Sequence, residues 1–201
     1  MCGDALETKS LSEKILSEVT SHDYVDKAFP MLSQWGVKDE DTLIHSLGCS
    51  YWMQLGHHLG YSGVVEVPAP LTYALRVNHD VRSDAVWFSY QDKQPKLVVE
   101  FERYGGTSSD RNKLEGKVKN LLLAYLRWSC APEIIVLAYW TIGLKTLPNH
   151  QKLKKLYADG FSFGSGEYIK GANPSRLMFM NFVFEMGNDN LYRLVSVIPR
   201  G

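Results

Sequence analysis

The chain has 201 residues, of which 45% are hydrophobic and 22% are charged, and its 22 basic residues balance its 22 acidic ones. This length and composition are typical of one folded domain and exclude an intrinsically disordered chain. Because the formal net charge is zero, no global field draws the protein to nucleic acid or to an anionic membrane. Any such binding requires a local patch, and we expect a single domain over residues 1–201.

The cysteines and the apolar segments bear on where the protein is found. The cysteines, Cys2, Cys49 and Cys130, are odd in number and far apart, so neither a disulfide framework nor a structural zinc site is expected. Residues 1–7 lack the basic and apolar regions of a signal peptide. The longest apolar stretch, 134–144, is shorter than the roughly 20 residues that span a bilayer. The sequence therefore predicts a cytoplasmic protein without a membrane segment.

The N-terminal part of the chain carries helical patterns. Residues 11–36 have apolar positions spaced for one or two short amphipathic helices, which Gly36 ends. In residues 39–59, leucines and other apolar residues recur at intervals of three and four, which predicts a long helix with one buried stripe.

From residue 64 on, a change in residue pattern predicts strands. The runs 64–68, 81–90 and 96–104 are short, rich in β-branched and aromatic residues, and bounded by turn formers. The link 91–95 is short and polar, so the second and third runs are expected to form an antiparallel hairpin.

The C-terminal part continues with alternating elements. Residues 105–110 break the third strand and offer caps for a second long helix. The continuous apolar run 133–140 is typical of a strand buried on both faces. The remaining expected segments are a short helix over 150–157, a loop over 161–174, and a terminal hairpin formed by 177–186 and 191–198.

Three acidic residues fall on the predicted hairpin. Asp84 lies in its first strand, and Glu100 and Glu102 lie in its second. Side chains two apart on a strand share a face, and a short turn brings Asp84 opposite that pair, so we expect the three carboxylates to converge. The alternative is that Glu100 and Glu102 form the solvated face of an edge strand.

Converging carboxylates need compensation, because like charges raise one another's pKa. A divalent cation is the usual compensator, and a small set of hard oxygen ligands suits Mg²⁺ or Mn²⁺ better than zinc. Such an ion activates water and stabilises charge on a phosphodiester.

Residues 40–140 resemble the PD-(D/E)xK nuclease superfamily of restriction and DNA-repair enzymes, whose core is a helix, a strand, a hairpin bearing the acids, a helix and a strand. The resemblance implies a restriction-endonuclease-like α/β fold with a central mixed sheet flanked by helices. It implies helices over 1–38, a nuclease core over 39–140, and a helix, loop and hairpin over 141–201. It also implies that Asp84, Glu100 and the carbonyl of Phe101 hold the metal. Arg82 gives the Arg-x-Asp form common in the family, and Asn120 stands where a helical Gln is more usual.

The sequence departs from the family at one position, since Glu102 occupies the place of the motif lysine. Glu102 is expected to serve as a further metal ligand or as the base that orients water. Alternatively, Lys113 or Lys117 on the following helix supplies a relocated lysine. The resulting prediction is a Mg²⁺- or Mn²⁺-dependent nuclease acting on DNA, or on RNA, in restriction, phage defence or a mobile element. The alternative is a nuclease-like module without catalysis that binds nucleic acid or a protein.

Other polar residues are weaker candidates. His45 and Cys49, four apart on the long helix, are interpreted as core packing because no second pair of ligands accompanies them. His57 and His58 are interpreted as partners of the helix end. Glu40 and Glu66 are candidate accessory acids. The basic residues expected to contact phosphates are Arg82, Arg111, Lys113, Lys117, Lys119, Lys152 and Lys155. A homodimer or a partner subunit is compatible with double-strand cleavage, although no residue demands it.

Overall fold

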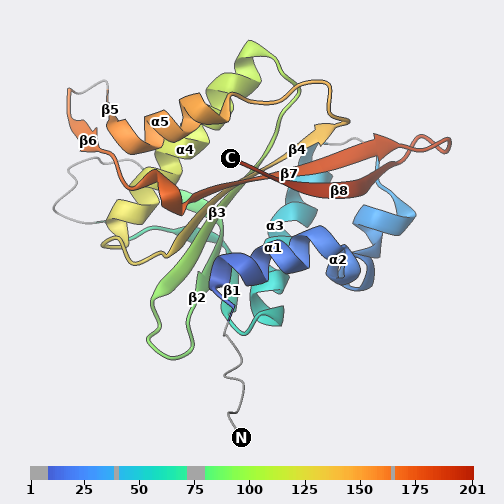
Figure 1. The fold of residues 1–201 in the computed structure, drawn as a ribbon, viewed down its shortest axis with the longest axis horizontal. Coiled ribbons are helices and arrows are strands. Elements are labelled where there is room, and N and C mark those ends of the chain that lie inside the picture. The colour runs from blue at the N-terminus through green and yellow to red at the C-terminus, as the bar shows by residue number, and fades with distance from the viewer. Residues whose placement is uncertain (1–8, 39–40, 72–79, 164–165) are drawn as a thin grey trace, which may run out of the picture.

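A computed structural model describes residues 9–38, 41–71, 80–163 and 166–201 (Figure 1). Its centre is a six-stranded sheet in the order β1-β2-β3-β4-β7-β8. Strands β3, β4 and β7 pair in parallel and the outer pairs are antiparallel, so the sheet is mixed as expected. The strands are β1 (Ser62–Pro68), β2 (Arg82–Phe88), β3 (Pro95–Arg103), β4 (Ile134–Ile142), β7 (Leu177–Met186) and β8 (Tyr192–Arg200).

Helices cover both faces of the sheet (Figure 1). One core contains Trp52 of α3 together with Phe101 and Trp140 of the strands. A second core, on the other face, contains Leu121 of α4 together with Val98. The first face is covered by α1 (Leu11–Ser21), α2 (Asp23–Ala28), the π-helical turn η1 (Met31–Trp35) and α3 (Asp41–His58), and the second by α4 (Ser108–Arg127) and α5 (His150–Asp159).

The central strand β4 confirms the prediction of a strand buried on both faces. Every residue of β4 except Ile142 is buried. A parallel strand between two helical layers has no solvated face, which explains why its sequence is a continuous apolar run rather than an alternating one.

Local sequence signals place the start of α4, which later carries part of the site. The Thr107 side chain accepts a hydrogen bond from the Asp110 backbone N–H, and the Asp110 carboxylate accepts one from the Thr107 N–H. This reciprocal capping satisfies two of the donors that a helix start leaves unpaired.

The prediction of a loop over 161–174 is wrong in part. The strands β5 (Gly160–Ser162) and β6 (Tyr168–Lys170) form a small antiparallel sheet, and a 3-10 turn, η2 (Pro174–Arg176), follows. Gly160 has a φ of 87°, and a Cβ there would lie 2.0 Å from the Ile169 carbonyl oxygen. Phe161 and Ile169 are buried in the second core, so packing overrides the Gly- and Ser-rich composition.

The other expected elements are confirmed. The hairpins β2–β3 and β7–β8 are antiparallel, and the long helices α3 and α4 lie where the apolar stripes predicted them. Among the described residues, no helix combines the length and apolarity needed to cross a membrane.

Candidate active site

The candidate site lies where β2 and β3 separate. The last pair that joins these strands is Ala85 with Val99, whereas β2 continues alongside β1 through Ser83 and Arg82. Beyond that pair, Oδ2 of Asp84 accepts a hydrogen bond from the Phe101 backbone N–H at 2.7 Å. The Asp84 carboxylate thus accepts a backbone N–H of β3 beyond the end of the β2–β3 ladder. This hydrogen bond holds the carboxylate between the two strands.

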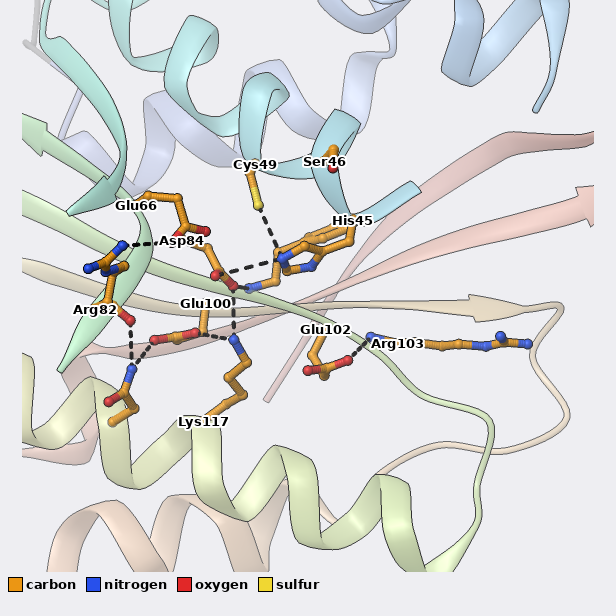
Figure 2. A network of polar contacts seen from close by, with 12 residues as sticks. His45, Ser46, Cys49, Glu66, Arg82, Asp84, Glu100, Glu102, Arg103 and Lys117 are labelled. Carbon is orange, nitrogen blue, oxygen red and sulfur yellow. Dashed lines mark hydrogen bonds and ion pairs between the residues drawn. The ribbon is translucent and has the colours of Figure 1, made fainter. Parts of the chain in front are cut away.

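Lys117 of α4 joins the two central acids (Figure 2). Its Nζ lies 2.6 Å from Oε2 of Glu100 and 3.2 Å from Oδ2 of Asp84. The side chains of Glu100 and Asp84 are 0% and 8% exposed, while that of Lys117 is 24% exposed. The cluster is therefore a buried triad of two acids and a lysine that reaches solvent through the lysine.

Asn120, one turn further along α4, completes the environment of Glu100. Its Nδ2 donates to Oε1 of Glu100 at 2.5 Å and to the Arg82 carbonyl oxygen at 2.9 Å. Residues three apart lie on the same face of a helix, so Lys117 and Asn120 present their donors to one carboxylate. Both oxygens of Glu100 thereby accept hydrogen bonds from α4.

Burial and charge act in opposite directions on this triad. Burial raises the pKa of Glu100 and the charge of Asp84 raises it further; Lys117 and Asn120 lower it, but the pKa stays above its ordinary value. Burial lowers the pKa of Lys117, but the charges of Glu100 and Asp84 outweigh that effect and raise it above its ordinary value. Lys117 is therefore a cation, and its charge offsets part of the cost of burying the two acids.

Glu102 is placed differently from the other two acids. It projects from β3 further along the strand, away from the triad, and its Oε1 accepts a hydrogen bond from the Arg103 backbone N–H at 3.0 Å (Figure 2). The structure thus brings Asp84 and Glu100 together with Lys117 and leaves Glu102 outside that group.

On the other side of the strand separation, α3 presents His45 and Cys49 to Asp84. Nε2 of His45 lies 3.6 Å from Sγ of Cys49 and 3.8 Å from Oδ1 of Asp84. Burial, together with the charges of Asp84 and Glu66, raises the pKa of the Cys49 thiol to about 12. The interpretation of this pair as core packing alone missed the carboxylate, because nothing in the spacing of residues 45, 49 and 84 reveals their proximity.

The accessory and basic candidates are mostly engaged locally. Arg82 lies 4.0 Å from Glu66 and 3.7 Å from Asp80. Lys152 pairs with Glu115 at 2.5 Å, Lys155 pairs with Asp159 at 2.6 Å, and Lys113 is exposed on α4. These ion pairs reduce the positive charge that Lys152 and Lys155 offer to a phosphate. Glu40 lies outside the described residues.

The two carboxylates of the triad are oxygen ligands of the kind that a hard divalent cation prefers. Two carboxylates from adjacent strands face the same point, and that point holds the Lys117 ammonium. A cation between Asp84 and Glu100 requires Nζ to withdraw, which a long and partly exposed side chain permits. Such an ion would be held by Asp84 and Glu100, together with the Phe101 carbonyl that the resemblance implies.

No family model, curated protein or solved structure matches this chain.

Proposed function

We propose that the protein is a metal-dependent nuclease of the restriction-endonuclease-like type, which hydrolyses phosphodiester bonds with DNA as the expected substrate. The observation that carries the proposal is the convergence of Asp84, Glu100 and Lys117 at the point where β2 and β3 separate. An Asp, a Glu and a Lys from a hairpin and the helix that follows it are the chemical groups that the superfamily motif provides. Here the lysine comes from α4 in place of Glu102.

Each residue has a distinct role in this proposal. Asp84 and Glu100 hold Mg²⁺ or Mn²⁺, which supplies an activated water and neutralises charge on the phosphodiester when bound. Lys117, a cation at neutral pH, orients the attacking water or donates to a phosphate oxygen. Asn120 holds the Glu100 carboxylate in place through its 2.5 Å hydrogen bond.

One observation favours a second candidate, a nuclease-like module that binds a partner without catalysis. Lys117 already neutralises Glu100 and Asp84 through contacts of 2.6 and 3.2 Å, so the triad is complete as a structural ion network. A permanent network of this kind stabilises the strand separation and binds no cation. Cation binding therefore separates the two candidates.

The first experiment measures cation binding. Titration with Mn²⁺ in calorimetry and thermal unfolding is expected to stabilise the native chain and to have little effect on Glu100→Gln, which removes one ligand charge. If Mn²⁺ and Mg²⁺ leave the native chain unchanged, the second candidate replaces the first.

The second experiment measures cleavage of supercoiled plasmid, single-stranded DNA and RNA with Mg²⁺ or Mn²⁺. Asp84→Asn, Glu100→Gln and Lys117→Met are each expected to lower the rate by about 100-fold or more, the range of one acid–base or electrostatic group. Glu102→Gln is the matched control on the same strand and should retain most of the activity. Undiminished cleavage by Glu100→Gln would contradict the assignment of the site.

A further inference from the structure

We infer that His45, Cys49 and Asp84 form a second metal site, which takes a borderline transition-metal ion such as Zn²⁺ on the α3 side of the strand separation. Their ligand atoms all lie within 4.8 Å of one another. Thiolate and imidazole are ligands that Zn²⁺ prefers and Mg²⁺ does not. The site is therefore distinct in chemistry from the pair of carboxylates proposed to hold the catalytic cation.

The distances between the ligand atoms suit an ion with tetrahedral coordination. Bonds of about 2.3 Å to sulfur and about 2.1 Å to nitrogen place those two atoms roughly 3.6 Å apart at a tetrahedral centre. The observed distance from Cys49 Sγ to His45 Nε2 is 3.6 Å, and Nε2 also faces Asp84 Oδ1 at 3.8 Å. One imidazole nitrogen thus points at both other ligands, and small side-chain movements suffice to close the site.

The two oxygens of Asp84 are divided between different partners. Oδ2 accepts from the Phe101 N–H at 2.7 Å and from Lys117 at 3.2 Å, whereas Oδ1 faces His45 (Figure 2). Hydrogen bonds to the far oxygen orient a ligating carboxylate and are a common support of metal sites. An ion at Oδ1 leaves both of these contacts in place.

The charges of the ligands and the access from solvent also suit a bound divalent ion. Cys49 is buried, while the His45 side chain is 34% exposed and gives the ion a route from solvent. Binding replaces the thiol proton of Cys49, which leaves to solvent, and the ion then lies against the negative charges of the thiolate and of Asp84. Three protein ligands leave a fourth position for water.

Co²⁺ is the probe, because a Co²⁺–thiolate bond gives a charge-transfer absorption in the near ultraviolet. The protein used is the full chain with Cys2→Ser and Cys130→Ser, which leaves Cys49 as the sole thiol. We expect one equivalent of Co²⁺ to bind with this absorption and Zn²⁺ to displace it. His45→Gln, whose side chain is partly exposed and tolerates change, should weaken binding at least about 100-fold, since even supporting residues of metal sites contribute 10- to 100-fold.

Several outcomes would overturn the inference: no Co²⁺ binding, binding without the thiolate absorption, or binding unchanged in both His45→Gln and Cys49→Ser. Glu100→Gln separates this inference from the proposed function, because it removes a ligand of the carboxylate pair and leaves His45, Cys49 and Asp84 intact. The thiolate absorption should persist in Glu100→Gln even where cleavage is lost.

Discussion

Replacement of Lys117 by methionine tests the central feature of the site, an ammonium that neutralises two buried carboxylates. Methionine keeps most of the apolar stem and removes the ammonium, with its charge and its hydrogen bonds to the two acids. In the native protein, Nζ contacts Glu100 at 2.6 Å and Asp84 at 3.2 Å, and the Glu100 side chain is 0% exposed. Removing one partner of a buried ion pair costs about 3–5 kcal/mol, because the remaining charge is left uncompensated. We expect a loss of that size in the free energy of unfolding at pH 8.

The loss should depend on pH. Burial and Asp84 raise the pKa of Glu100, and loss of Lys117 removes a group that lowers it. A carboxyl whose pKa is raised on folding contributes stability that is fully present below its unfolded pKa and is lost as pH rises through its folded pKa. Lys117→Met should therefore be less destabilised at pH 5 than at pH 8, because Glu100 binds a proton there.

Urea denaturation followed by tryptophan fluorescence measures this effect, since Trp52, Trp87 and Trp140 are buried. The control is Lys113→Met, which removes an exposed charge from the same helix and should change the free energy of unfolding by less than about 0.5 kcal/mol. A loss below about 1 kcal/mol at pH 8, or equal losses in both variants, would show that Lys117 does not neutralise the buried acids.

Two further predictions concern the packing and titration of the fold. Gly48→Ala places a Cβ 2.2 Å from the buried ring of Phe101 and should lower the free energy of unfolding by about 1–3 kcal/mol. Gly116→Ala, whose Cβ has nothing within 4 Å, should raise it by about 1 kcal/mol. Equal effects of the two changes in chemical denaturation would contradict this packing. Burial, Arg200 and Lys154 lower the pKa of His150. The neutral imidazole therefore contributes stability at pH values above the ordinary histidine pKa, and this stability is lost as the pH falls through the folded pKa. His150→Gln keeps a hydrogen-bonding side chain near the Tyr139 hydroxyl, which lies 2.9 Å from Nε2 of His150, and should lose less stability than the native chain between pH 7 and 5; parallel curves would refute this role.

Much of the architecture follows from local rules that a sequence displays. The apolar stripes of α3 and α4, the caps at Thr107 and the apolar run of β4 depend on neighbours a few residues away. The loop prediction failed at β5 and β6 because their stability comes from burial of Phe161 and Ile169 against distant residues. The amino-acid composition of the segment does not reveal this burial.

The chemistry of the site depends both on local sequence patterns and on tertiary packing. The alternation along β3 and the short hairpin turn are enough to predict that Asp84 and Glu100 lie on neighbouring strands. Three other features depend on how the helices pack against the sheet: Lys117 contacts both acids, Glu102 lies apart, and His45 and Cys49 approach Asp84 from the opposite layer. The physical reason is that strand pairing is set by periodicity of two, whereas contacts between layers are set by how each helix packs across the sheet and where two strands separate.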